Sequence, residues 1–327
     1  MAHLLVTGGA GYIGSHAVLA LREAGHSVVI LDDLRAGHAE LVGDVPLVRS
    51  DVCDPAALER VFRENGPFEG VLHFAAYLDV AESLARPLDY YRNNTGGSAA
   101  LLHAMIEHDC RVFVLSSTCA TYGIPALLPI DEDTPQQPIQ PYGASKWMVE
   151  RMLGDAERAH GLRWAALRYF NAAGADAAGR TGECHEPEIH LVPSALEAVA
   201  GLREGLSLHG SDYDTPDGTC VRDYVHVTDL ADAHVRALEA LLAGRPVGAR
   251  NLGTGNGTSN RQVLDAVGRV VGTPVPVTLG PRRPGDPPQL VADARRFRAE
   301  HGWEPRHSDI ENIVATAWAW LRKWKGL

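Results

Sequence analysis

Tyr142 and Lys146 are the residues whose types and spacing most directly suggest acid–base chemistry. Residues four apart lie on one face of a helix, so this spacing places the phenol beside the ammonium. A free tyrosine titrates near pH ~10, too high for a base at neutral pH. A neighbouring Lys charge, joined by a positively charged cofactor, would lower that pKa. The sequence therefore predicts a Tyr142 base assisted by Lys146; the alternative is a surface pair worth a few tenths of a kcal/mol.

Three hydroxyl residues, Ser116, Ser117 and Thr118, follow an apolar segment that we predict to be a strand. At the end of a strand their side chains would point toward a bound substrate, and we favour Thr118 for that contact. The alternative is a strand edge whose hydroxyls are satisfied locally.

Gly8, Gly11 and Gly14 form a G-x-x-G-x-x-G pattern after the apolar segment Leu4–Thr7 and at the start of a helical pattern. Residues without side chains let the backbone approach a pyrophosphate at a helix N-terminus. Asp32 ends the next predicted strand, where an acid can hydrogen-bond the adenosine ribose. A carboxylate there repels the 2′-phosphate of NADP, so the sequence predicts an NAD site.

Two further acids are candidates at the same site. Asp33 can share the work of Asp32, and Asp51 with Val52 matches an adenine contact by fold analogy. For both acids the alternative is an ordinary turn residue.

The chain has 327 residues, with 30 Lys and Arg against 41 Asp and Glu, and a formal net charge of −11. This balance argues against non-specific nucleic-acid binding, which needs a basic surplus. The sequence start lacks signal-peptide features and no apolar run reaches membrane-spanning length, so we expect a cytoplasmic protein. Five scattered cysteines predict no disulfide framework. The tract Cys184–His190 holds ligand-type side chains, but we predict a polar loop and no metal.

Alternating strand and helix patterns dominate the first half of the chain, as in βαβ units on a parallel sheet. Strands are predicted at Leu4–Thr7, Ser27–Leu31, Pro46–Arg49, Gly70–Phe74, Val112–Ser116 and Trp164–Arg168. Helices are predicted at Tyr12–Ala24, from Pro55 onward, and at Pro87–His108, Tyr142–His160, Pro193–Arg203, Val227–Ala243, Ser259–Val271 and Ile310–Trp324. The predicted fold class is α/β, a Rossmann-like doubly wound parallel sheet with a smaller α/β C-terminal lobe. We expect residues 1–172 to bind NAD, with part of 217–255 returning to that domain, and residues 173–327 to bind the substrate.

Several longer segments carry a family resemblance over nearly the whole chain. They are Val6–His16, His73–Ala76, Pro141–Lys146, Leu167–Asn171, Gly218–Val227 and Pro281–Asp286. With these segments in order, the chain resembles the extended short-chain dehydrogenase/reductase family, most closely its UDP-glucose 4-epimerases. The resemblance implies that bound NAD oxidises the 4-hydroxyl of a UDP-sugar. The 4-keto sugar then turns and takes the hydride back on its other face, which interconverts UDP-glucose and UDP-galactose.

The resemblance also implies roles for individual residues. Tyr142 would remove the hydroxyl proton, Thr118 would hydrogen-bond the same hydroxyl, and Lys146 would hold the nicotinamide ribose. The implied cofactor-binding residues are Gly8, Gly11, Tyr12, Ile13, Gly14, Asp32, Asp33, Asp51, Val52, Phe74, Ala75, Ala76, Asn94, Ser116, Tyr142, Lys146 and Tyr169. The implied substrate-binding residues are Thr118, Tyr142, Asn171, His190, Leu191, Ser207, His209, Arg222, Arg283 and Asp286.

The phosphate contacts have their own alternatives. Asn171, Arg222 and Arg283 would bind the diphosphate, where the planar donor fork of arginine fits phosphate oxygens. Asp286 would lie close to the uridine ribose. Alternatively, Arg222 forms a salt bridge with Asp223, and Arg283 is a solvated loop charge.

Three positions depart from the family pattern. Leu78 stands where some members have Lys, His190 where many have Asn, and Leu290 where some have a bulky aromatic residue. At Leu78, near the cofactor, we expect one ribose or phosphate contact to be missing. Because Leu290 leaves more room for the sugar than an aromatic side chain, we expect N-acetylhexosamines to be accepted as well.

Three other functions compete with this one. A 4-epimerase for UDP-GlcNAc, a UDP-pentose or a UDP-uronate remains open. A nucleotide-sugar dehydratase is disfavoured, because no Asp-Glu pair follows Thr118. A non-catalytic NAD sensor is disfavoured, because Tyr142 and Lys146 are both present.

A homodimer is expected from the resemblance. The surface would come from two helices, through Ala99, Leu101, Leu102, Met105, Met148 and Met152. Ordinary packing of these side chains against the sheet is the alternative.

Overall fold

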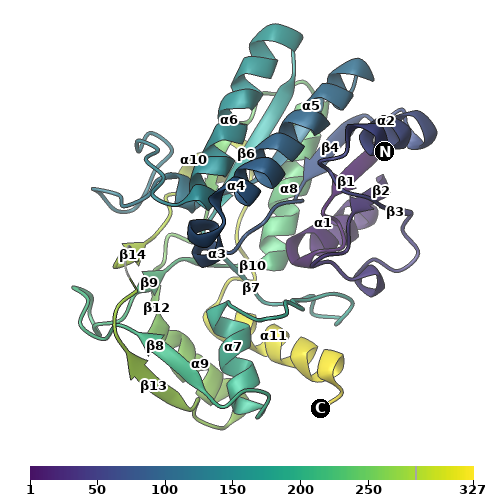
Figure 1. The fold of residues 1–327 in the computed structure, drawn as a ribbon. Helices are drawn as coiled ribbons and strands as arrows, with labels where there is room; N and C mark the ends of the chain where they lie inside the picture. The colour runs from purple at the N-terminus through teal and green to yellow at the C-terminus, as the bar shows by residue number, and fades with distance from the viewer. Residues whose placement is uncertain (284–285) are drawn as a thin grey trace.

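A computed structural model describes residues 1–283 and 286–327 of the chain. Its centre is a seven-stranded parallel sheet with the strand order β11-β6-β5-β4-β1-β2-β3 (Figure 1). The strands are β1 (His3–Thr7), β2 (Ser27–Asp32), β3 (Leu47–Arg49), β4 (Gly70–His73), β5 (Val112–Thr118), β6 (Arg163–Tyr169) and β11 (Gly248–Leu252). The order reverses direction at β1, so the predicted doubly wound Rossmann-like sheet is confirmed.

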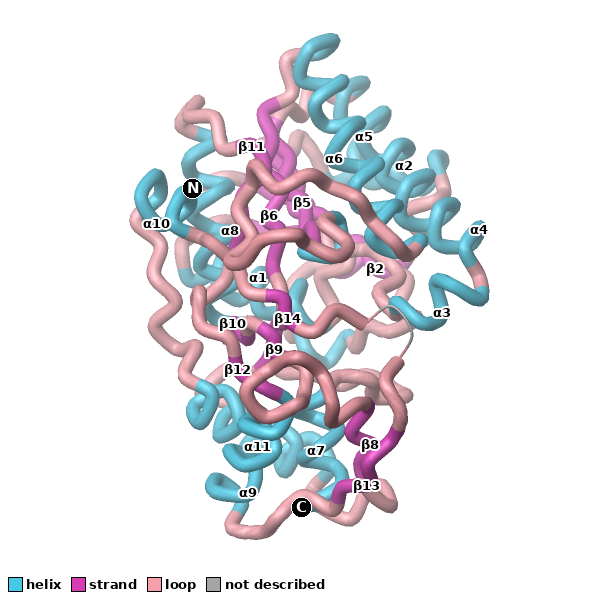
Figure 2. The backbone as a smooth tube through the Cα atoms, turned by 90° about the vertical axis from the view of Figure 1, so that its left-hand side faces the viewer, coloured by secondary structure: helices cyan, strands magenta, loops and turns pink. Residues whose placement is uncertain are grey.

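Helices cover both faces of this sheet (Figure 2). One face carries α1 (Tyr12–Glu23), α8 (Val227–Leu242) and α10 (Arg295–His301), and the other carries α2 (Pro55–Asn65), α5 (Gly97–Glu107) and α6 (Pro141–His160). Leu4 and Val6 of β1 pack toward the first group and Leu5 toward the second. This alternation follows from the two-residue period of a strand and gives the sheet an apolar core on each side.

A smaller lobe lies below the carboxyl ends of the large sheet in Figure 1 and holds the C-terminus. Its helices are α7 (Leu191–Val199), α9 (Asn260–Val271) and α11 (Ile310–Lys325), which share one apolar cluster. Its short strands pair as β8 (Leu206–His209) with β13 (Val277–Gly280), and as β9 (Val221–Arg222) with β12 (Thr258–Ser259) and β14 (Gln289–Leu290). A third pair, β7 (Asn171–Ala173) with β10 (Tyr224–His226), joins the lobe to the end of β6.

The predicted helix Pro87–His108 is divided in the structure. It consists of α4 (Pro87–Tyr90), a π-helical segment at Tyr91–Gly96 and α5. Two helices that the sequence pattern missed are α3 (Val80–Ala85) and α10. Two single 3₁₀ turns, Ala39–Leu41 and Cys119–Thr121, complete the helical segments.

Local sequence signals account for two of the helix ends. Asp54 caps α2 by accepting from the Ala56 and Ala57 N–H groups, and Pro55 is its first residue. Gly25 follows α1 with φ +84°, the left-handed conformation that suits glycine after a helix.

Part of the predicted dimer surface is wrong. Leu101, Leu102 and Met105 are buried in the core between α5 and the large sheet, so they are not available to a partner. Ala99 and Met148 are exposed. In the described residues we find no helix long and apolar enough to span a membrane.

Candidate active site

A cavity of about 1240 Å³ separates the carboxyl edge of the large sheet from the smaller lobe. Of the predicted cofactor and substrate residues, all line this cavity except Asn94. They come from the ends of β1, β2, β4, β5 and β6 on one side and from the segments around α7, β8, β9 and β14 on the other. Ligands of open α/β sheets bind at this edge, so the cavity is the candidate active site.

The glycine loop connects β1 to α1 at one end of the cavity. Gly8 has φ +71°, and a Cβ on Gly14 would lie 2.1 Å from the Gly8 carbonyl oxygen. A Cβ on Gly11 would meet only that oxygen, at 3.4 Å, so this residue faces open space. No side chain caps the N-terminus of α1. Its first-turn N–H groups and helix dipole therefore fit a pyrophosphate.

Asp32 ends β2 and is almost fully buried. Its Oδ2 accepts from the Ala10 N–H at 2.9 Å, and its Oδ1 accepts from the Leu34 N–H at 2.9 Å. Burial raises the pKa of this carboxyl, while the two backbone hydrogen bonds oppose the shift. Asp32 thus ties β2 to the glycine loop and still lines the cavity.

The other two acids at this end also accept local backbone hydrogen bonds. Asp33 accepts from the Arg35 N–H and Asp51 from the Cys53 N–H, both within turns. Their turn interpretation therefore holds, and both still lie on the cavity wall. Val52 is buried beside them.

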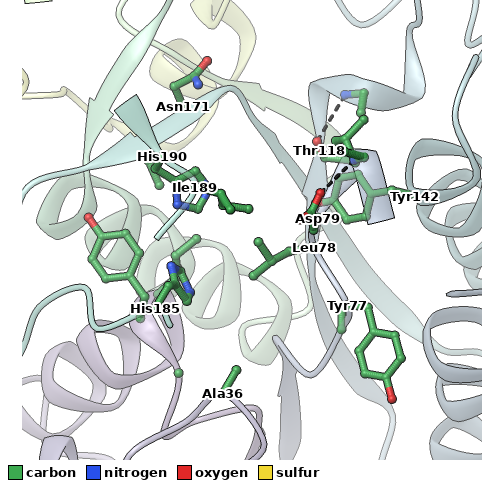
Figure 3. A pocket seen from close by; sticks show the side chains of 18 of the residues that line it. Ala36, Tyr77, Leu78, Asp79, Thr118, Tyr142, Asn171, His185, Ile189 and His190 are labelled. Carbon is green, nitrogen blue, oxygen red and sulfur yellow. Dashed lines mark hydrogen bonds between the residues drawn. The ribbon is translucent and has the colours of Figure 1, made fainter. Parts of the chain in front are cut away.

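Thr118 and Tyr142 lie side by side on the cavity wall, where β5 ends and α6 begins (Figure 3). Burial raises the pKa of Tyr142 to about 12, only partly offset by the neighbouring Thr118 hydroxyl. Lys146 follows one turn later, and its Nζ donates to the Ser116 carbonyl oxygen at 2.9 Å. Burial lowers the pKa of Lys146 to about 8, opposed by Glu150. In the protein alone, Lys146 therefore does not produce the predicted lowering of the Tyr142 pKa. A lowering of this pKa by a cationic cofactor stays a prediction.

Ser116 and Asn94 support this wall in different ways. The Ser116 hydroxyl is hydrogen-bonded to the Tyr169 hydroxyl, which holds two predicted cofactor residues together. Asn94, buried in the π-helical segment, bonds the Tyr77 N–H and carbonyl and the Ser145 hydroxyl. Asn94 therefore positions the loop at Tyr77 and α6 without reaching the cavity itself.

Sequence reasoning missed a buried ion pair behind the catalytic wall. Arg168 of β6 donates to both carboxylate oxygens of Glu150 on α6, and Ser117 donates to Glu150 Oε1 at 2.6 Å. The Arg168 guanidinium also donates to the Tyr122 hydroxyl at 2.8 Å. The signal was present, since Glu150 lies four residues after Lys146 and Arg168 interrupts an apolar strand. This network fixes the helix that carries Tyr142 and Lys146.

Arg222 lines the cavity on the side of the smaller lobe, but its partner is not its neighbour in sequence, Asp223. Its guanidinium is paired with Asp286 and donates to the Pro287 carbonyl. Asp223 instead accepts from the Thr254 and Gly255 N–H groups and from Ala292. The alternative of an Arg222–Asp223 salt bridge is therefore wrong.

The remaining substrate candidates surround the same space. Asn171, His190, Leu191, Ser207, His209, Arg283 and the departures Leu78 and Leu290 all line it. Figure 3 shows His185, Ile189 and His190 across the cavity from Thr118 and Tyr142. The cavity therefore presents a hydroxyl pair on one wall and basic or polar groups on the other.

Comparisons with known proteins agree with this geometry. The model of the NAD dependent epimerase/dehydratase family matches residues 4–253. The chain is 52% identical to a UDP-glucose 4-epimerase from Azospirillum brasilense over 320 residues, covering 98% of this chain and 92% of the relative. It is similar to the crystal structure of UDP-glucose 4-epimerase from Brucella ovis in complex with NAD, with TM-score 0.95, 47% identity and 98% of each chain covered. A structure from Stenotrophomonas maltophila, with bound NAD and formylated UDP-arabinopyranose, gives TM-score 0.95 at 39% identity, covering 100% of this chain and 99% of that one.

Proposed function

The chain belongs to the NAD dependent epimerase/dehydratase family, and we propose that it is a UDP-glucose 4-epimerase, an isomerase that interconverts UDP-glucose and UDP-galactose. The observation that carries the proposal is the Thr118–Tyr142 hydroxyl pair on one cavity wall, with Lys146 one turn further along α6. Relatives of the same name at high identity over nearly the full length support it. The runner-up is a 4-epimerase of another UDP-sugar, since one similar structure contains a UDP-pentose derivative.

NAD fits the end of the cavity beside the glycine loop. Gly11 and the first turn of α1 would hold its pyrophosphate, and Asp32 its adenosine ribose. When bound, NAD supplies a hydride acceptor that can return what it has taken. The carboxylate of Asp32 disfavours a 2′-phosphate, which supports NAD over NADP.

The chain's own residues handle the proton. Tyr142 would take the proton of the sugar 4-hydroxyl, and Thr118, beside Tyr142 on the same wall, would orient that hydroxyl. Because burial holds the Tyr142 pKa near 12, the phenolate needs added positive charge close by. A cationic nicotinamide beside Lys146 would provide it only when the cofactor is oxidised. Tyr142 would then return the proton after the sugar has turned.

Inversion at carbon four requires a firm hold on the nucleotide and a loose hold on the sugar. Arg222, Arg283 and Asn171 would bind the diphosphate, and Asp286 the uridine ribose. On the hexose side, Leu290 offers apolar surface and no directional hydrogen bonds. The 4-keto sugar could therefore rotate while its diphosphate stays in place.

We propose that the enzyme works as a homodimer in the cytoplasm. Ala99 and Met148 are exposed on α5 and α6 and Met152 is half-buried, so these three residues remain candidates for the dimer surface. All five cysteines are free thiols, which suits a reducing compartment. Sedimentation at micromolar concentration should give the mass of two chains; a mass of one chain would exclude the dimer.

The assay is conversion of UDP-galactose to UDP-glucose by purified protein without added NAD. Activity would demonstrate both the reaction and a retained cofactor. Tyr142→Phe should lose at least ~100-fold in rate, because general base catalysis contributes on that scale. Tyr169→Phe, which removes a hydroxyl from the same wall, is the matched control and should keep more activity. Full activity of Tyr142→Phe would remove the proposed base.

A further inference from the structure

Residues 183–190, between β7 and α7, bring four ligand-type side chains together beside the cavity. Glu183, His185, Glu188 and His190 each offer one ligand atom, and these atoms all lie within 4.8 Å of one another. The two imidazoles lie next to each other in Figure 3. The sequence predicted only a polar loop here, because no second cluster of ligand-type residues completes a tetrahedral set.

The cluster is largely enclosed and is held in place by its surroundings. The side chains of Glu183 and Glu188 are 6% and 4% exposed. The Trp320 indole N–H donates to the Glu183 carbonyl at 2.9 Å, and Glu188 Oε1 accepts from the Ile189 and His190 N–H groups at 2.8 Å. The segment therefore has a fixed shape before any ion binds, which lowers the cost of forming a site.

The carboxylates of the cluster are paired with its own histidines, and His190 Nδ1 also lies 3.5 Å from Glu188 Oε1. Both histidines direct Nδ1 at Glu183 Oε1, at 2.9 Å for His185 and 2.5 Å for His190. Among residues 1–283 and 286–327, no Lys or Arg forms a salt bridge with Glu183 or Glu188. Two carboxylates out of water are costly unless cations compensate them. Without a metal, both imidazoles must be protonated to balance both carboxylates, whereas one divalent cation compensates both.

We propose that Glu183, His185, Glu188 and His190 form a binding site for a divalent transition-metal ion. Two imidazole nitrogens and two carboxylate oxygens are a donor set that Zn²⁺ accepts in four-coordinate sites. Zn²⁺ bonds of ~2.0–2.2 Å place tetrahedral ligand atoms farther apart than the present Nδ1–Oε1 hydrogen bonds. Binding therefore displaces the shared protons and spreads the cluster slightly.

The site would have a structural role and would also hold His190, a predicted substrate contact, at the cavity wall. His185 packs edge-on against Tyr12 of α1, with ring centroids 6.3 Å apart, and Leu191 after the cluster begins α7. A bound ion would therefore fix the loop that joins the glycine-loop end of the cavity to the smaller lobe. This role requires no change in the proton chemistry at Tyr142.

The test uses untagged full-length protein, stripped with a chelator and titrated with Zn²⁺ by calorimetry at two pH values. One equivalent should bind with release of protons, and the melting temperature should rise with Zn²⁺ concentration. Glu183→Gln and His185→Ala should each weaken binding by more than about 100-fold. His160→Ala, an exposed histidine at the end of α6, is the control and should bind like the wild type.

A rival explanation is a hydrogen-bonded cluster that holds a proton in place of a metal. In that case Zn²⁺ would leave the melting temperature unchanged, and the variants would alter stability without altering metal content. Either result, or unchanged Zn²⁺ affinity in both variants, would overturn the site. Circular dichroism and bound-NAD content of each variant establish that it is folded.

Discussion

Alanine substitutions at Gly14 and Gly11 of the glycine loop should damage different properties of the protein. A Cβ at Gly14 would lie 2.1 Å from the Gly8 carbonyl oxygen and 2.9 Å from Gly9 Cα, both backbone atoms. A Cβ at Gly11 would have only a 3.4 Å contact and would point into open space. Gly14→Ala should therefore damage the fold, and Gly11→Ala should damage the cofactor site.

The magnitudes follow from these contacts. Overpacking against a rigid neighbour costs ~1–3 kcal/mol, and Gly14→Ala should reach at least the upper end because backbone must move. Gly11 is the N-cap of α1, where alanine is disfavoured, so Gly11→Ala should cost at most about 1 kcal/mol of stability. Its methyl group would block backbone hydrogen bonds to the pyrophosphate worth ~1.5–3 kcal/mol each. NAD affinity should therefore fall by roughly 10- to 150-fold for each bond lost.

Two measurements separate the effects. Thermal unfolding should place Gly11→Ala near the wild type and Gly14→Ala well below it. Bound NAD, released by denaturation and quantified, should be depleted in Gly11→Ala, and added NAD should restore its epimerase activity. The reasoning is refuted if Gly11→Ala purifies with a full complement of NAD, or if Gly14→Ala is as stable as the wild type.

Three further predictions concern support, pH and sugar range. Glu150→Gln leaves Arg168 without its buried counter-charge and should destabilise the protein by ~3–5 kcal/mol. The double replacement Glu150→Leu/Arg168→Met should destabilise it less, and chemical denaturation would measure both effects. Burial lowers the pKa of His16 and His234 to about 4 and that of His73 and His226 to about 3. Between pH ~6.5 and these lowered pKa values, only the unfolded chain binds the protons. The free energy of unfolding should therefore fall as the pH is lowered through this range. His234→Leu should reduce that acid slope by up to ~1.4 kcal/mol per pH unit, and an unchanged slope would contradict the assignment. The wild type should turn over UDP-GlcNAc and UDP-glucose at similar rates. Leu290→Tyr should slow turnover of UDP-GlcNAc by about 10-fold relative to UDP-glucose. No turnover of UDP-GlcNAc by the wild type would refute the expected acceptance of acetylated sugars.

The large sheet was predictable because its strands are apolar segments separated by helical patterns with recognisable caps. Elements of two or three residues, such as β7, β12 and β14, are too short to show a period. The division of the helix at 91–96 also escaped, since a π-helical segment keeps ordinary helical composition. Local signals thus define the scaffold, whereas short pairings depend on distant partners.

The cavity wall was predictable to a similar degree, and for a related reason. Residues held in short motifs, such as Gly8–Gly14 and Tyr142–Lys146, carry their spacing in the sequence. The Glu150–Arg168 pair joins a helix to a strand, and only the register of β5 with β6 brings it beside Ser117. The direction of the Tyr142 pKa shift could not be predicted either, because it depends on burial by the whole wall.

Arg222 and Asp223 are adjacent and oppositely charged, but each binds a different partner and they do not pair with each other. The chain leaves β9 at Arg222 and enters β10 at Tyr224, so consecutive side chains point to opposite sides. Asp223 is fully buried and gathers N–H groups from the 254–255 turn and from Ala292, which anchors the substrate wall next to the large sheet. With its backbone fixed in this way, Arg222 presents its guanidinium at the cavity beside Asp286. The ion pair leaves little net charge there, so Arg222 would recognise a diphosphate through the geometry of its donors more than through its charge.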